Sequence, residues 1–290
     1  MFTLKAPAKI NLTLEVIGKR PDGYHEVASI IQAISLSDIL EFEPAENFAF
    51  LCDSPDWKAE KSLVSRASSL FVSRLGAGGG ARINIHKNIP FSAGLGGESS
   101  AAAITLIGLN HLLQADLPPG DLYHLAEKLG SDVPFFLTGG TALVSGRGEK
   151  VSPLPALPHY WVILLIPADM DTPGKTEKMY ACLRPGNFTA GRITDDFISS
   201  LAHGDMKTLP DLYNVFERVA GQVFGGIDWY KEQFYLAGAS RVNMAGSGPV
   251  LFSMETDKTA AEQIVQRLKQ QGLKAILAHT LDSLGPAGFI

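Results

Sequence analysis

The residues best suited to chemistry in this chain lie in a glycine-rich segment near its middle. Residues 94–97 hold three glycines, and Ser99 and Ser100 follow closely. The alternating residues 81–86 before the segment predict a strand, and the alanine- and leucine-rich stretch Ser99–Leu113 predicts a helix. Glycine lets the backbone approach a ligand closely, and the first N–H groups of a helix attract anions. The order strand, loop, helix therefore predicts a phosphate-binding loop.

This loop differs from the best-known phosphate-binding patterns. Gly94 and Gly96 fit the Rossmann spacing, but Ser99 stands where its third glycine would be. The segment Gly174-Lys175-Thr176 ends like a Walker loop but lacks the glycine that should begin one, so we reject a Walker-type nucleotidase. A flexible surface turn is the alternative for residues 94–100, because turns use glycine and serine for purely local reasons.

Two smaller groups of residues could also bind or react. Residues 9–16 alternate polar with apolar, so Lys9 and Asn11 share one face of a predicted strand. A lone lysine on such a face is usually solvated, so the alternation alone does not assign Lys9 and Asn11 to a binding site. Gly246-Ser247-Gly248 lies between two predicted strands near the C-terminus. It is either a tight hairpin or a second set of N–H groups for an anion.

Composition narrows the classes of protein to consider. The chain has 290 residues, enough for roughly two domains, with 46% hydrophobic and 19% charged residues, as in ordinary globular proteins. A net charge of −5 argues against broad nucleic-acid binding, and no apolar run is long enough to span a membrane. The N-terminus lacks the apolar core of a secretory signal, and two cysteines without metal or redox spacing fit a reducing cytoplasm. We therefore expect a cytoplasmic protein.

The chain is expected to form two domains joined near a proline-rich stretch, residues 152–158. The expected domains are residues 1–155 and 156–290. The second part reads as β-α-β-β-α-β with extra helices in its first crossover. This order predicts a ferredoxin-like antiparallel sheet with helices on one face, and an α+β fold class for the whole chain.

Three ordered motifs resemble those of the GHMP small-molecule kinases. They lie at residues 6–12, 94–100 and 245–248. One branch of this superfamily is similar over further motifs, at residues 20–26, 129–136 and 214–217. That resemblance implies phosphorylation by ATP, with Mg²⁺, of the 2-hydroxyl of 4-diphosphocytidyl-2-C-methyl-D-erythritol, in the non-mevalonate route to isoprenoid precursors. It also implies an N-terminal domain like domain 2 of ribosomal protein S5 and a C-terminal ferredoxin-like domain.

The resemblance assigns roles to particular residues. Asp132 is the expected catalytic base, and Lys9 is expected to pair with Asp132 and with the reacting oxygens. The expected ATP-binding residues are Lys87, Pro90, Ser92, Ala93, Gly94, Leu95, Gly96, Gly97, Glu98, Ser99 and Ser100. The expected substrate-binding residues are Asn11, Tyr24, His25, Thr176, Tyr180, Gly246, Ser247 and Gly248. Tyr180 is expected to stack on the cytosine. Ser100 is expected near Mg²⁺, and no residue is assigned as a metal ligand.

Two residues depart from the family's glycine-rich loop. Glu98 replaces a glycine, and Ala101 replaces a polar residue. Glu98 would repel phosphate if it pointed inward; solvent and the metal are the other directions open to it. The two departures support one alternative, a nucleotide-binding module that has lost catalysis, against which an intact Lys9 and Asp132 weigh. An oligonucleotide-binding protein is a third hypothesis, which the net negative charge of the chain disfavours.

Asn214 and Glu217 are interpreted as structural residues that tie a helix to the glycine loops. The expected partner of the chain is a small-molecule substrate, cytidine diphosphate methylerythritol, with no nucleic acid and no membrane. The chain is expected as a monomer or a weak homodimer.

Overall fold

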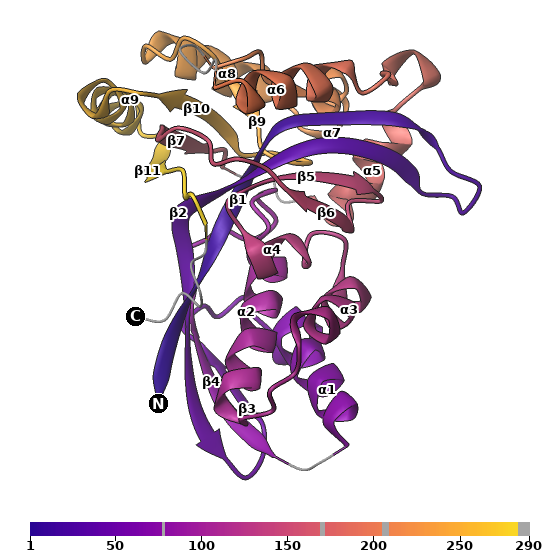
Figure 1. The fold of residues 1–290 in the computed structure, drawn as a ribbon. Coiled ribbons are helices and arrows are strands. Elements are labelled where there is room, and N and C mark those ends of the chain that lie inside the picture. The colour runs from indigo at the N-terminus through magenta and orange to yellow at the C-terminus, as the bar shows by residue number, and fades with distance from the viewer. Residues whose placement is uncertain (77–78, 169–171, 205–208, 284–290) are drawn as a thin grey trace.

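Two β-sheets with helices packed on them make up the protein. The computed structural model describes residues 1–76, 79–168, 172–204 and 209–283. Within these residues, one sheet has seven strands and the other has four (Figure 1). None of the helices described there is long and apolar enough to cross a membrane.

The first sheet is built around two long strands, β1 (Phe2–Lys19) and β2 (His25–Ala45), which pair antiparallel. Figure 1 shows both strands running from the lower part of the molecule, beside α2, to the upper part, beneath α6. The sheet is completed by β3 (Ala49–Cys52), β4 (Gly80–His86), β5 (Thr141–Gly146), β6 (Lys150–Pro153) and β8 (Tyr213–Asn214). A turn after Arg20 joins β1 to β2, with the N–H of Gly23 donating to the Arg20 carbonyl at 3.1 Å.

Helices cover the first sheet on the side where the glycine-rich loop lies. They are α1 (Leu63–Leu75), α2 (Gly97–Leu112), α3 (Pro119–Leu129) and the short α4 (Phe135–Thr138). α2 begins two residues earlier than expected, because Gly96 adopts a left-handed conformation at the N-cap position. Ser99 and Ser100 therefore lie in the first turn of α2 and do not cap it. This turn faces the loop that precedes it.

The second sheet has the strand order β11-β7-β10-β9 and is antiparallel throughout. Its strands are β7 (Trp161–Ile166), β9 (Asn243–Met244), β10 (Leu251–Glu255) and β11 (Lys274–His279). The helices of this part are α5 (Lys175–Cys182), α6 (Arg192–Ala202), α7 (Ala220–Val223), α8 (Ile227–Leu236) and α9 (Lys258–Gln270). The predicted ferredoxin-like order is confirmed, and the Asp257 side chain caps α9 by accepting from the N–H of Ala260 at 2.7 Å.

The two sheets are joined by more than the connecting chain. β8, from the second part of the sequence, pairs parallel with β1 at Thr13 and Leu14. An apolar cluster also joins them, with Ile10 of β1 buried among side chains that include Leu164 and Phe252. Residues of β1 can therefore meet residues of the second part at fixed distances. The boundary expected at residue 155 stays a prediction.

Gly108 of α2 packs directly against the core of the first sheet, which gives a test of the packing. A Cβ added at Gly108 would lie 2.4 Å from Cζ of Phe42, a fully buried side chain. We expect Gly108→Ala to lower the free energy of unfolding by about 1–3 kcal/mol, because overpacking outweighs the gain in helix propensity. Gly120→Ala, in α3 with open space around it, is the matched control. Thermal melts with Gly108→Ala at or above wild type would contradict this packing.

Candidate active site

Two glycine loops touch through their backbones at the centre of the site. A Cβ at Gly94 would lie 2.2 Å from the carbonyl oxygen of Ala245. A Cβ at Gly246 would lie 2.8 Å from the carbonyl oxygen of Gly94. Both glycines have positive φ, +82° and +53°, so each position excludes a side chain on two grounds. The segments 94–97 and 246–248, distant in sequence, thus form one surface.

The glycine-rich loop lines a pocket, here called the loop pocket, whose volume of about 570 Å³ includes space open to solvent. It is lined by Lys87, Pro90, Phe91, Ser92, Ala93, Gly94, Leu95, Gly96, Gly97, Glu98 and Ser99. The side chains of Ala93 and Leu95 are buried in the core, so the loop offers mainly its backbone to a ligand. The first turn of α2 adds N–H groups that have no partner within the helix. Such a pocket suits an anion.

Lys87, an expected ATP-binding residue, is held at the entrance of this loop by a buried carboxylate. Its ammonium pairs with Asp38, and these side chains are 6% and 0% exposed. The other oxygen of Asp38 accepts from the N–H groups of Asn88 and Ile89, each at 2.8 Å. Phe91, exposed at the rim, lies under the Lys87 ammonium, 5.0 Å from ring centre to nitrogen. Asp38 therefore fixes the chain that leads into the loop.

Glu98 lines the loop pocket and also makes a contact that the sequence did not indicate. Its carboxylate accepts a hydrogen bond of 3.3 Å from the N–H of Leu63, the first residue of α1. A carboxylate is favourable at a helix N-terminus, where the helix dipole is positive. Ala101 is 2% exposed and packs in the apolar core. Packing therefore explains why an alanine can stand where the family has a polar residue.

A second pocket, here called the central pocket, has a volume of about 740 Å³ that includes space open to solvent. Its wall brings together residues from both parts of the chain. The expected site residues that line it are Lys9, Asn11, Gly94, Gly96, Asp132, Thr176, Tyr180, Gly246 and Ser247. Gly94 and Gly96 also line the loop pocket, so the two pockets meet at these glycines.

Lys9 and Asp132 lie next to each other in the wall of the central pocket. The Lys9 ammonium lies 3.6 Å from a carboxylate oxygen of Asp132, and the two side chains are 5% and 39% exposed. The Lys9 ammonium also donates to the Asn11 side chain at 2.8 Å, and Asn11 donates to the Ser29 hydroxyl at 2.8 Å. A Cβ at Gly96 would lie 3.1 Å from Cγ of Lys9, so the loop packs on the lysine stem. A cation and a carboxylate are thus placed beside the loop.

An aromatic group forms another side of the site. The rings of His25 and Tyr180 are stacked, with centres 4.8 Å apart, and Phe216 packs edge-on against Tyr180 at 4.9 Å. Burial raises the pKa of Tyr180 to about 12, with Asp132 adding to the shift, so its phenol stays protonated at any working pH. Burial, and then Lys19, lowers the pKa of His25 below its usual 6.5, so its ring is neutral at pH 7. Both rings offer uncharged hydrogen-bonding groups.

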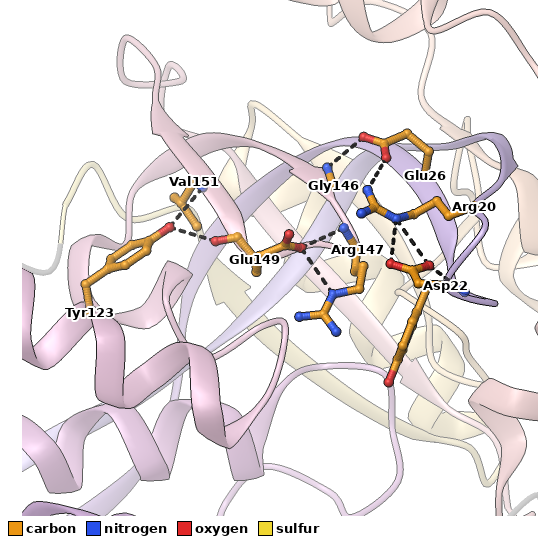
Figure 2. Close-up of polar contacts among 9 residues, drawn as sticks. Arg20, Asp22, Glu26, Tyr123, Gly146, Arg147, Glu149 and Val151 are labelled. Atoms are coloured by element: carbon orange, nitrogen blue, oxygen red, sulfur yellow. Dashed lines mark hydrogen bonds and ion pairs between the residues drawn. The ribbon is translucent and has the colours of Figure 1, made fainter.

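Arg147 also lines the central pocket, although the sequence analysis did not single it out. Figure 2 shows how the turn carrying it is held: Glu26 accepts from Arg20 and, at 3.1 Å, from the N–H of Gly146. The Glu149 carboxylate accepts from the N–H of Arg147 at 2.6 Å. The guanidinium lies over the exposed Tyr24 ring, 4.8 Å from its centre. The signal available in the sequence was an arginine between two glycines, Gly146 and Gly148.

The interpretation of Asn214 and Glu217 as structural residues is confirmed. The Asn214 amide donates to the carbonyls of Met244 and Gly246, each at 2.7 Å. Glu217 accepts from the N–H of Met244 at 2.9 Å and pairs with Lys231 at 2.7 Å. Together they fix the segment that leads into the second glycine loop, from β8 and the 3₁₀ turn that follows it.

The first turn of α2 has a buried hydroxyl without a hydrogen-bond partner among the described residues. Ser100 is fully buried, and its hydroxyl oxygen has no hydrogen-bond partner among the described residues. Buried polar atoms normally have a partner, so the Ser100 oxygen is an exception that a bound group could satisfy. Among the described residues, no three or more His, Cys, Asp or Glu side chains gather as a metal site.

Comparison with known proteins defines the class. The family described as GHMP kinases N terminal domain matches residues 62–140, and GHMP kinases C terminal matches residues 197–274. A 4-diphosphocytidyl-2-C-methyl-D-erythritol kinase of Dehalococcoides mccartyi strain BAV1 is 47% identical over 98% of this chain and 100% of its own. The enzyme of that name from Pelotomaculum thermopropionicum is 37% identical over 97% and 99%.

Solved structures of GHMP kinases are also similar to this chain. A crystal structure of 4-(cytidine 5'-diphospho)-2C-methyl-D-erythritol kinase has a TM-score of 0.82 at 33% identity, covering 96% of this chain and 98% of its own. A homoserine kinase from Cytophaga hutchinsonii, 19% identical with a TM-score of 0.76 over 97% and 95% of the two chains, shares the fold. The chain belongs to the GHMP kinases and, within them, to the family of the 4-diphosphocytidyl-2-C-methyl-D-erythritol kinases.

The position of Glu98 can be tested by separating stability from nucleotide affinity. Glu98→Ala removes the acceptor for the Leu63 N–H, so we expect it to lower the free energy of unfolding by about 0.5–1.5 kcal/mol. Glu98→Gln keeps an acceptor oxygen and is expected to lose less. Neither variant should bind an ATP analogue much more tightly than wild type. Calorimetry that showed both binding at least about tenfold more tightly would mean that the carboxylate faces the phosphates.

Proposed function

We propose that this chain transfers the γ-phosphoryl group of ATP to the 2-hydroxyl of 4-diphosphocytidyl-2-C-methyl-D-erythritol, in the non-mevalonate route to isoprenoid precursors. The names of its relatives indicate this reaction. The observation that carries it is the meeting of the two pockets at Gly94 and Gly96, beside Lys9 and Asp132. The loop pocket takes the triphosphate, and the central pocket takes the cytidine-bearing alcohol.

Each residue has a role in this reaction that follows from its position. An alcohol is a weak nucleophile, and Asp132 accepts its proton as the phosphoryl group moves. The Lys9 ammonium stabilises the negative charge that develops on the reacting oxygens. The backbone N–H groups of the loop hold the phosphates, and most of the rate comes from this positioning and charge stabilisation. No covalent intermediate with the protein is required.

The substrate-binding roles rest on the remaining wall of the central pocket. Asn11 is placed by Lys9 to bind the alcohol, and Thr176 and Ser247, whose hydroxyls lie 2.8 Å apart, offer hydrogen bonds. Tyr180 offers an aromatic face for the cytosine, with His25 beside it and Tyr24 on the rim. Arg147 adds positive charge that suits a diphosphate.

Mg²⁺ enters with ATP in this proposal. The hydroxyl of Ser100 would hold it at the loop, since that buried oxygen has no other partner among the described residues. The ion would neutralise charge on the phosphates as the phosphoryl group is transferred.

The reaction is tested by supplying the purified protein with Mg-ATP and the cytidine substrate and following ADP. We expect ADP release that depends on the substrate. Mevalonate and homoserine serve as controls, and neither should be turned over. ADP release with mevalonate or homoserine and none with the cytidine compound would move the chain to another branch of the superfamily.

The role of Asp132 is tested by Asp132→Asn, which keeps the shape of the side chain and removes its basicity. We expect turnover to fall by about 10²–10⁴-fold with little change in the affinity for an ATP analogue. Asp196→Asn, an exposed position of α6, is the control and should retain full turnover. Near-normal turnover in Asp132→Asn would show that another group takes the proton.

A further inference from the structure

A buried lysine joins the two glycine loops. Lys175, the first residue of α5, is 9% exposed, and its ammonium donates to the carbonyls of Ser92 and Gly248. Ser92 belongs to the glycine-rich loop, and Gly248 belongs to the second loop. An ammonium has three donors and is costly to bury unless they are used. Its hydrogen bonds therefore fix the separation of the two loops.

The carbonyl that Lys175 holds in the first loop belongs to a strained residue. Ser92 has a φ of +50°, one of the few positive values at a non-glycine residue in the described chain. A residue with a Cβ adopts this left-handed conformation only when its surroundings hold it there. Because the Ser92 carbonyl is bonded to Lys175, the lysine opposes relaxation of the loop to a right-handed conformation.

The same helix carries the residues expected to bind the substrate. Thr176, next in sequence, has its hydroxyl 2.8 Å from that of Ser247, and Tyr180 stacks on His25 one turn further along. Lys175 thus belongs to the wall that would hold the cytidine compound, and it is bonded to the loop that would hold ATP. Lys175 therefore connects α5 to both glycine loops, and Thr176 adds a contact to the second loop.

We propose that Lys175 is a positioning residue that sets the geometry of the phosphate loop relative to the acceptor alcohol, acting through the carbonyls of Ser92 and Gly248. The kinetic part of this proposal rests on the proposed function. Without the lysine, both substrates still bind, but the γ-phosphoryl group and the hydroxyl are misplaced. A displacement of about 1 Å is enough to lower a rate by about 100-fold.

The experiment compares Lys175→Met with Lys178→Met, an exposed lysine on the same helix, in the full chain. Lys175→Met is expected to lower kcat by about 100-fold while both KM values change by less than about threefold. In a Ser92→Gly background the loss in kcat is expected to shrink to about tenfold or less, because glycine needs no support in the left-handed conformation. Lys178→Met should match wild type.

A second measurement is independent of turnover. Hydrogen exchange of the protein without substrates is expected to be at least about tenfold faster in Lys175→Met at residues 91–97 and 246–248, and unchanged in Lys178→Met. If Lys175→Met fails to fold, Lys175→Arg, which keeps the charge but not the compact ammonium, replaces it in every comparison.

The outcomes separate the two proposals. No turnover by wild type would contradict the proposed function, and hydrogen exchange would still decide whether Lys175 orders the loops. Unchanged exchange in the loops would overturn the positioning role. A rise in KM for the cytidine compound with unchanged kcat, or an equal loss of kcat with and without the Ser92→Gly substitution, would also overturn it, because Lys175 would then not act through Ser92.

Discussion

The contact between two stretches of backbone is the constraint on which the rest of the site depends. Gly94 and Gly246 approach so closely that neither position has room for a Cβ. Each loop is then held by groups behind it: Asp38 fixes the chain entering the first, and Asn214 and Glu217 fix the chain entering the second. These supports leave backbone N–H groups at the surface where phosphates are expected. A site made of backbone needs such rigid support because it has no side chains that can adjust.

The long strand β1 brings the charges of the site to this contact. Lys9 projects from β1 and packs against the first loop. Asp132, which comes more than a hundred residues later in the sequence, lies in the segment between α3 and α4 and pairs with Lys9. β8 adds the second part of the chain to the same strand at Thr13 and Leu14. The apolar cluster shared by the two sheets keeps this arrangement at fixed distances. The Lys9–Asp132 pair and the second loop therefore belong to one structural unit.

Local patterns in the sequence predicted the elements well, and long-range contacts poorly. Alternation placed Lys9 beside Asn11, and the spacing of strands and helices predicted the ferredoxin-like sheet. The proximity of Lys9 to Asp132 came only from the family resemblance, since no periodicity connects residues so far apart. Lys175 was considered only as part of a Walker-type loop, which was rejected, and its burial could not be foreseen without its partners. Arg147 was missed because an arginine in a turn looks like an ordinary surface residue. The direction of Glu98 also depended on a distant residue, the N–H of Leu63.

The central claim is that two ligands meet at Gly94 and Gly96, with Lys9 and Asp132 beside the point of transfer. A crystal structure with a non-hydrolysable ATP analogue and the cytidine substrate tests this most directly. The account predicts the terminal phosphate at the loop, and the 2-hydroxyl within hydrogen-bonding distance of the Asp132 carboxylate. A triphosphate bound away from residues 94–97, or an acceptor hydroxyl out of reach of Asp132, would contradict it.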